Sequence, residues 1–191
     1  WRDSYFWPRQ SNWDVVTSAL MALETWAQER MDAGEPIEPV LQDIIGPEGS
    51  PAAYVLVAVD VMLSHWPASR DVLWPFAASA ELVAMDRQRM GIQAPNLASL
   101  GGLGSNATLD TAAEKRNSRL SRRMSLEVAF DLYAWYGTPE QREAMRAVLA
   151  EQMQVMGPPD PDRSTASDPR LVAFRAFHRL DTGNYRRGET G

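Results

Sequence analysis

The segment that most constrains the fold runs from Ala52 to Leu63 and is apolar at almost every position except Asp60. Its valines would also suit a buried strand, but the segment is longer than a typical strand and no second β-rich run exists to pair with it. The preceding Ser50-Pro51 pair is typical of a helix start. We therefore predict a helix here that is apolar nearly all round and lies at the centre of the fold.

Helix signals recur along the rest of the chain. Apolar residues three or four positions apart predict an amphipathic helix from about Asn12 to Gly34, with Val16, Leu20 and Leu23 on its inner face. Caps, prolines and glycines set the ends of the others. The predicted fold class is all-α, with about eight helices in antiparallel pairs that form an irregular helical repeat or an orthogonal bundle. The other predicted helices follow Pro39 or span about 69–74, 80–90, 117–136, 140–156 and 169–180.

The predicted domain organisation has four parts. An aromatic-rich segment at 1–11 precedes a helical domain at 12–156, which contains a long loop at 91–111 with a glycine run. A proline-rich linker at 157–168 leads to a C-terminal helix and basic tail at 169–191. The chain of 191 residues starts at Trp1 and not at methionine, so we expect it to be a domain of a longer protein.

Few residues in the sequence suggest catalysis. The chain has no cysteine and only two histidines, which rules out thiolate chemistry and leaves no metal-binding motif. The glycine run at 101–105 lacks the Lys-Ser/Thr ending and the preceding strand of a phosphate-binding loop. We predict no catalytic residue, no metal and no cofactor, and the sequence leaves open whether the fragment is an enzyme.

Asp60 and His65 form a candidate buried polar network. An ionised carboxylate inside an apolar helix must find a partner or accept a raised pKa. An arginine partner is the structural interpretation, and a functional site is the alternative. The two residues are five positions apart, about 140° round a helix, so we do not expect them to act as a local acid–base pair.

The main basic feature is a group of five residues in the second half of the chain. Residues 1–100 carry 6 arginines and 13 acidic residues, a net charge of −7, whereas residues 101–191 carry 13 basic and 12 acidic residues, a net charge of +1. On a continuous helix, Arg116, Arg119 and Arg123 would share one face that could bind phosphate or an acidic partner. Solvated ion pairs are the alternative. The candidate phosphate or partner surface comprises Lys115, Arg116, Arg119, Arg122 and Arg123.

Three short motifs combine a small, an apolar and an acidic residue inside a helix. They are centred on Leu23, Val59 and Phe130, at spacings of 36 and 71 residues that suit helix–turn–helix repeats. With the Ser64–Pro67 turn closing the apolar helix, this organisation resembles the irregular HEAT-like or armadillo-like repeats of large bacterial multidomain proteins, including signal-transduction ATPases. The resemblance implies a sensor or scaffold arm and assigns no functional residue.

Three functions remain as hypotheses. The leading one is a non-catalytic helical scaffold or sensor domain that contacts protein partners within a larger bacterial, cytoplasmic protein. The second is a module that binds nucleic acid or nucleotide through the basic residues, with help from Arg175, Arg179, Arg186 and Arg187. The third is an all-α enzyme whose site is assembled from scattered residues. The longest apolar run is too short to cross a bilayer, so no membrane partner is expected.

Overall fold

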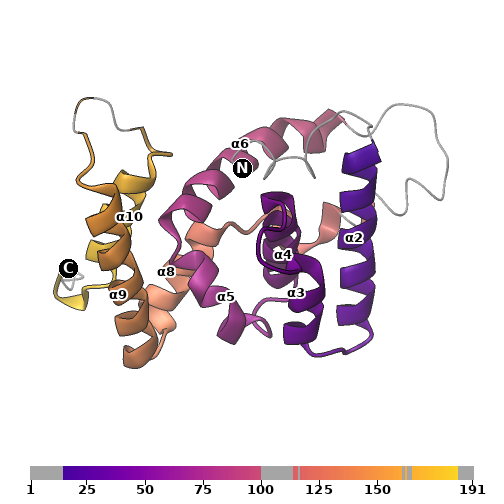
Figure 1. The fold of residues 1–191 in the computed structure, drawn as a ribbon, viewed down its shortest axis with the longest axis horizontal. Coiled ribbons are helices and arrows are strands. Elements are labelled where there is room, and N and C mark those ends of the chain that lie inside the picture. The colour runs from indigo at the N-terminus through magenta and orange to yellow at the C-terminus, as the bar shows by residue number, and fades with distance from the viewer. Residues whose placement is uncertain (1–14, 100–113, 116, 161, 163–164, 185–191) are drawn as a thin grey trace, which may run out of the picture. The chain divides into compact units, whose positions relative to one another are not determined.

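The computed structural model describes residues 15–99, 114–115, 117–160, 162 and 165–184, and for residues 91–99 it describes the backbone alone (Figure 1). Over these residues the chain is all-helical and contains no strand, as predicted. The predicted N-terminal segment at 1–11 lies outside the described residues. The elements are α2 (Val15–Asp32), α3 (Ile37–Ile45), α4 (Ala52–Ser64), α5 (Arg70–Ala77), α6 (Ala80–Ser99), η2 (Leu120–Arg122), α8 (Leu126–Tyr136), α9 (Pro139–Met156), α10 (Pro169–Arg179) and η3 (Thr182–Asn184).

The chain divides into two compact units. Unit 1 comprises Trp1–Leu73 and Gln88–Ser125, and unit 2 comprises Trp74–Arg87 and Leu126–Gly191. This division differs from the predicted domain at 12–156, because the chain passes between the units within α5, within α6 and just before α8 and not at a proline-rich linker.

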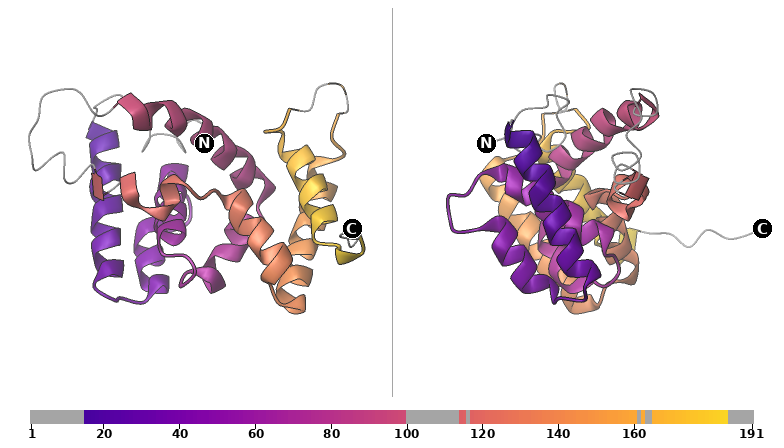
Figure 2. Two further views of the ribbon diagram at one scale, coloured as in Figure 1. Left: turned by 180° about the vertical axis from the view of Figure 1, so that it is seen from behind. Right: turned by 90° about the vertical axis from the view of Figure 1, so that its right-hand side faces the viewer.

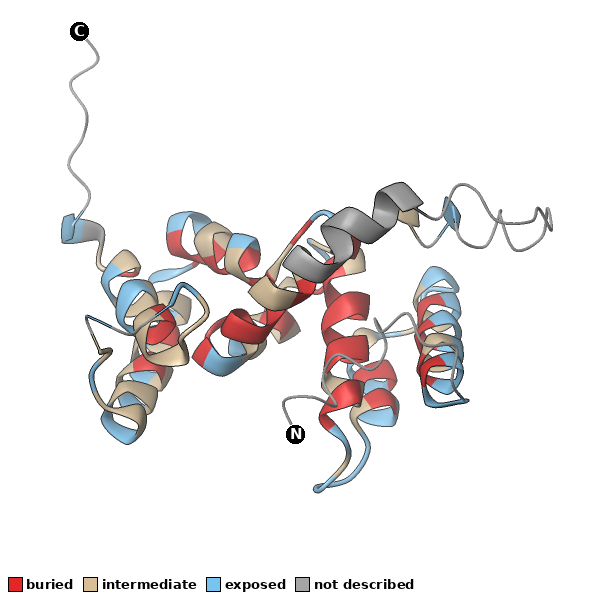
Figure 3. Ribbon diagram, turned by 90° about the horizontal axis from the view of Figure 1, so that it is seen from above, coloured by how far each residue is buried: buried red, intermediate tan, exposed pale blue. Residues whose placement is uncertain are grey.

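The core of unit 1 is built around α4, which packs against α2, α3 and η2. Ten of its thirteen residues are buried, so the prediction of a central helix is confirmed. The N-terminus of α4 differs from the prediction in one detail. Pro51 is the cap residue, and the Ser50 hydroxyl donates to the carbonyl oxygen of Pro47 instead of capping the helix. Buried residues are red in Figure 3.

The core of unit 2 forms where α8, α9 and α10 pack together (Figure 2). The start of α9 is capped by Thr138, whose hydroxyl accepts from the Gln141 amide at 3.1 Å, and α9 ends at Gly157 with a φ of +74°. The Asp168 carboxylate caps α10 in the same way, and proline occupies the first helical position after both caps. These local signals made both helices predictable.

Two predicted segments are corrected by the structure. The backbone of α6 stays helical to Ser99, so the predicted loop at 91–111 is wrong over 91–99, and residues 100–113 lie outside the described residues. The predicted helix over 117–136 is interrupted, because Arg119 adopts an extended backbone before η2 and a new helix starts at Leu126. The carboxylate of Asp86 accepts a hydrogen bond from the Leu126 amide at 2.7 Å, and this contact fixes the start of α8.

Candidate functional site

A cluster of four buried charged residues lies in unit 1: Glu24, Asp60, Arg89 and Arg122, here called the charge cluster. They come from α2, α4, α6 and η2, and each is at most 6% exposed. The Asp60 carboxylate oxygens lie 3.7 Å from a guanidinium nitrogen of Arg89 and 3.8 Å from one of Arg122. Asp60 therefore has the arginine partner that was predicted, and two arginines take this role.

Arg122 also binds Glu24, with 2.6 Å between a guanidinium nitrogen and Glu24 Oε1. Burial lowers the pKa of Arg122, and the neighbouring charge of Glu24 opposes that effect. Arg89 donates to the backbone oxygens of Ser121 at 3.0 Å and Met124 at 3.3 Å, so it holds the interrupted segment against α6.

The charges within the cluster balance, with two arginines against two carboxylates. Pairing opposite charges offsets part of the cost of burying each of them. All four side chains are nearly or fully buried, and each contacts another member of the cluster. We therefore interpret the charge cluster as a structural junction of four elements and not as a reactive centre.

His65 takes part in a separate polar contact. Its Nε2 lies 2.9 Å from Gln28 Oε1 and 3.9 Å from an oxygen of Asp32, both on α2. Burial lowers the pKa of His65, while the Asp32 charge raises it and the Arg119 charge lowers it further. The structure thus places the two residues in different contacts, His65 against Gln28 and Asp32 of α2, and Asp60 against arginines of α6 and η2. They form no local acid–base pair, as their helical spacing predicted.

We expect His65 to titrate below its ordinary pKa of 6.5. Because the folded chain binds the proton less tightly than the unfolded chain, this residue should reduce stability as the pH falls below about 6.5. An NMR titration of the H178Q variant, in which His65 is the only histidine, measures the midpoint directly. A midpoint above 6.5 would contradict the burial argument.

The predicted basic surface does not form as a single helix face. Arg122 points into the charge cluster and Arg119 is half-buried, whereas Lys115 and Arg123 are exposed. Lys115 Nζ lies 3.3 Å from an oxygen of Asp32, and Arg116 lies outside the described residues. The prediction assumed a continuous helix, and the extended backbone at Arg119 breaks the periodicity on which a shared face depends.

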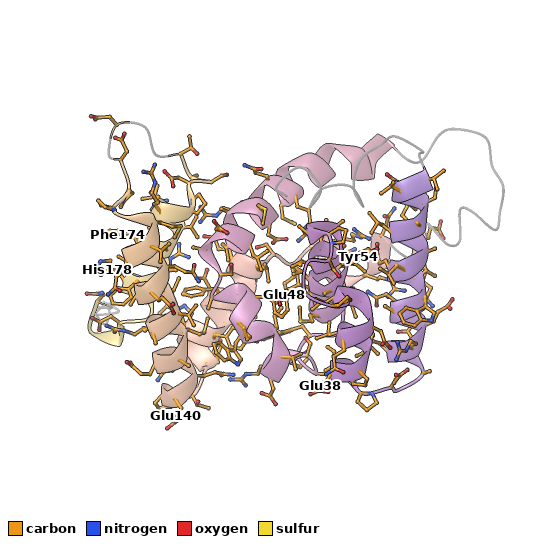
Figure 4. The ribbon with its side chains drawn as sticks, viewed as in Figure 1. Glu38, Glu48, Tyr54, Glu140, Phe174 and His178 are labelled. Atoms are coloured by element: carbon orange, nitrogen blue, oxygen red, sulfur yellow. The ribbon has the colours of Figure 1, made fainter. Side chains whose placement is uncertain are left out.

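The second histidine lies on α10 in unit 2. His178 is exposed and packs edge-on against Phe174, with ring centroids 4.5 Å apart, and against Phe177 at 5.6 Å (Figure 4). Arg175, on the same helix, is also exposed. The placement of His178 on the surface agrees with a packing role at the edge of the unit.

A half-buried ion-pair network surrounds a small pocket in unit 2. The Arg87 guanidinium binds both carboxylate oxygens of Glu127 and holds the pKa of that carboxyl below its usual range. Arg179 donates to Glu127 at 3.4 Å and to Asp131 at 2.9 Å. The pocket beside them has a volume of about 20 Å³, enough for about one water molecule, whereas sites for small organic ligands usually exceed about 300 Å³.

In the described part of the chain, no group of three or more histidine or acidic side chains lies close enough together to hold a metal ion. Within the same ranges, no helix combines the length and the apolar character that crossing a bilayer requires.

The helix α2 buries polar side chains and exposes apolar ones. Its buried residues are Thr17, Leu20, Glu24, Ala27 and Gln28, of which three are polar or charged. Its opposite side carries Val15, which is 85% exposed, and Trp26, which is 42% exposed. We call this side the outer α2 face and define it by Val15, Val16, Ala19, Ala22 and Trp26, all of which are exposed.

The outer α2 face carries no charge. Between positions 15 and 28 the only charged residue is Glu24, which is buried, and the next outward-facing charge along the helix is Glu29. The guanidinium carbon of Arg30 lies 4.4 Å from the ring centroid of Trp26, while Arg30 also binds Glu35 and Asp43. These contacts hold the tryptophan in place while leaving part of its ring in solvent.

No protein-family model, curated protein or solved structure matches this chain. The resemblance to HEAT-like and armadillo-like repeats therefore stays a prediction. Of the three acidic positions in the short motifs, Glu24 and Asp60 meet in the charge cluster, whereas Asp131 pairs with Arg179 in the other unit.

Sequence reasoning missed the outer α2 face and the inward position of Arg122. The predicted inner face of α2 included Val16, which is 45% exposed, and Leu23, which is half-buried. Glu24 indicated which side of α2 is buried. A pairing of this acidic residue with the basic residues near position 122 would have predicted the orientation of the helix.

Proposed function

We propose that this chain is a non-catalytic helical scaffold module that contacts other protein through the outer α2 face. The observation that carries the proposal is that α2 buries the charged residue Glu24 while it exposes Val15 and Trp26 on its opposite side. Exposed apolar stripes of this kind are typical of protein contact sites. A tryptophan held in place by its neighbours is a common centre of such contacts.

Two further features support a contact module. The buried charged residues of unit 1 are paired with one another, which suits a structural role. The small pocket of unit 2 has room for about one water molecule and not for an organic substrate. As the resemblance to helical-repeat arms suggests, we infer that the module works within a larger bacterial, cytoplasmic protein.

Site-specific photo-crosslinking in cells tests this proposal. A photoreactive phenylalanine analogue at position 22 lies on the outer α2 face, and the same analogue at position 42 lies on α3, where Gln42 is exposed in the same unit. We expect covalent protein adducts from position 22 that position 42 does not give. Equal labelling from both positions, or none from position 22, would contradict the proposal.

A further inference from the structure

The outer α2 face has the spacing of a helix-pairing seam. Its central residues Val15, Ala19, Ala22 and Trp26 follow one another at intervals of four, three and four positions, which places them in one narrow row along the helix. Small residues in such a row allow a second helix to approach closely, with axes about 8 Å apart. The row therefore fits another helix better than it fits a flat protein surface.

The order of large and small residues in this row is symmetric about a point between residues 20 and 21. A second α2 that runs antiparallel about a twofold axis at that point would place Ala19 opposite Ala22, and Val15 opposite Trp26. Small residues would meet at the crossing, and the larger residues would meet at its two ends. Self-association of this kind needs a single self-complementary patch.

Charge also favours a second copy at this face. The whole chain has a net charge of −6, so the net charges of two copies repel each other. The outer α2 face is uncharged across three turns, and it is a place where two copies meet without opposing like charges. We propose that two copies of this chain associate through their outer α2 faces as an antiparallel helix pair, an inference that rests on the proposed function and names its partner.

The contact area between the two helices sets the expected strength of the dimer. A helix of 18 residues is roughly 27 Å long, and a strip of that length and about 10 Å width falls short of the roughly 800 Å² per partner of a standard interface. We therefore expect a weak dimer. Because no ion pair holds it together, raising the salt concentration should strengthen association or leave it unchanged.

Sedimentation velocity over about 5 to 500 µM protein tests for the dimer. We expect the A22R variant to weaken association at least tenfold, because each copy would place an arginine in the apolar crossing. Its matched control is Q42R, an exposed change on α3 that should leave association unchanged. Arginine and alanine are both good helix formers, so A22R should fold normally, which circular dichroism can verify.

Disulfide trapping tests the antiparallel arrangement, since the chain has no cysteine of its own. In a mixture of V15C and W26C chains, a pair with one copy of each places the two cysteines opposite each other at one end of the crossing. The other end keeps the native Val15 and Trp26. Two identical chains hold their cysteines about 16 Å apart, beyond the reach of a disulfide. We expect mixed disulfides and few symmetric ones.

Three results would overturn the inference: a monomer at all concentrations, equal weakening by A22R and Q42R, or symmetric V15C disulfides. A monomer that still gives adducts with other proteins from position 22 would overturn the second-copy inference and leave the proposed function standing. A monomer without such adducts would overturn both.

Discussion

Replacing Arg122 with methionine should destabilise unit 1 by about 3–5 kcal/mol, the usual cost of breaking a buried ion pair by removing one partner. Among the four residues of the charge cluster, the change leaves one cation, Arg89, against Glu24 and Asp60, so these four positions acquire a net charge of −1 in a buried setting. Urea unfolding followed by circular dichroism measures the loss.

The neighbouring Arg123 provides the control for this experiment. It is exposed, so the R123M variant should lie within about 0.5 kcal/mol of the wild type. Adding E24L to R122M should recover part of the loss, because the second change removes the uncompensated acid. A loss below about 1 kcal/mol in R122M, or no recovery in the double variant, would show that the charge cluster matters little.

Replacing Leu149 with alanine should destabilise unit 2 by about 2–5 kcal/mol through the cavity that it leaves. Leu149 on α9 is 1% exposed. The matched control is V155A on the same helix, because Val155 is 82% exposed and its truncation creates no cavity. Urea unfolding gives the magnitude.

Hydrogen exchange of the L149A variant then tests the division into two units. Because Leu149 belongs to unit 2, we expect faster exchange in α9 and α10 while the amides of α4 in unit 1 keep their protection. Equal acceleration in α4 would show that the chain unfolds as one cooperative body.

Most of the helical fold could be predicted from local signals. The apolar run at 52–63 has a single charged residue, which predicted the buried helix α4. The pairs Thr138-Pro139 and Asp168-Pro169 are strong helix starts, and they predicted α9 and α10. Helix periodicity and caps depend on residues close in sequence, which explains why these predictions succeeded.

Contacts between distant residues explain where prediction failed. The interruption before α8 depends on Asp86, which binds the amide of Leu126 from forty positions away. The inward turn of Arg122 depends on Glu24, ninety-eight positions away. No local pattern contains either contact, so a continuous helix with an exposed basic face was the natural prediction.

The candidate site shows the same limit. The need of Asp60 for an arginine followed from its burial, but the sequence offered no way to choose Arg89 and Arg122 from the eighteen arginines. The outer α2 face was missed for a related reason. An apolar stripe is usually assigned to the core, and a buried acid on the other side is needed to reverse that choice.

The ion pair of α2 selects one rotational setting of this helix over a more apolar one. Rotating α2 about its own axis by about 100°, the angle between neighbouring residues, would bury Val16 and Leu23 in place of Thr17 and Glu24. That alternative hides more hydrocarbon but takes Glu24 away from Arg122. Apolar burial alone favours the alternative setting, and the polar contacts of Glu24 with Arg122 and of Gln28 with His65 oppose it. A neutral residue at position 24 should therefore let α2 sample both settings and withdraw part of its apolar surface from solvent.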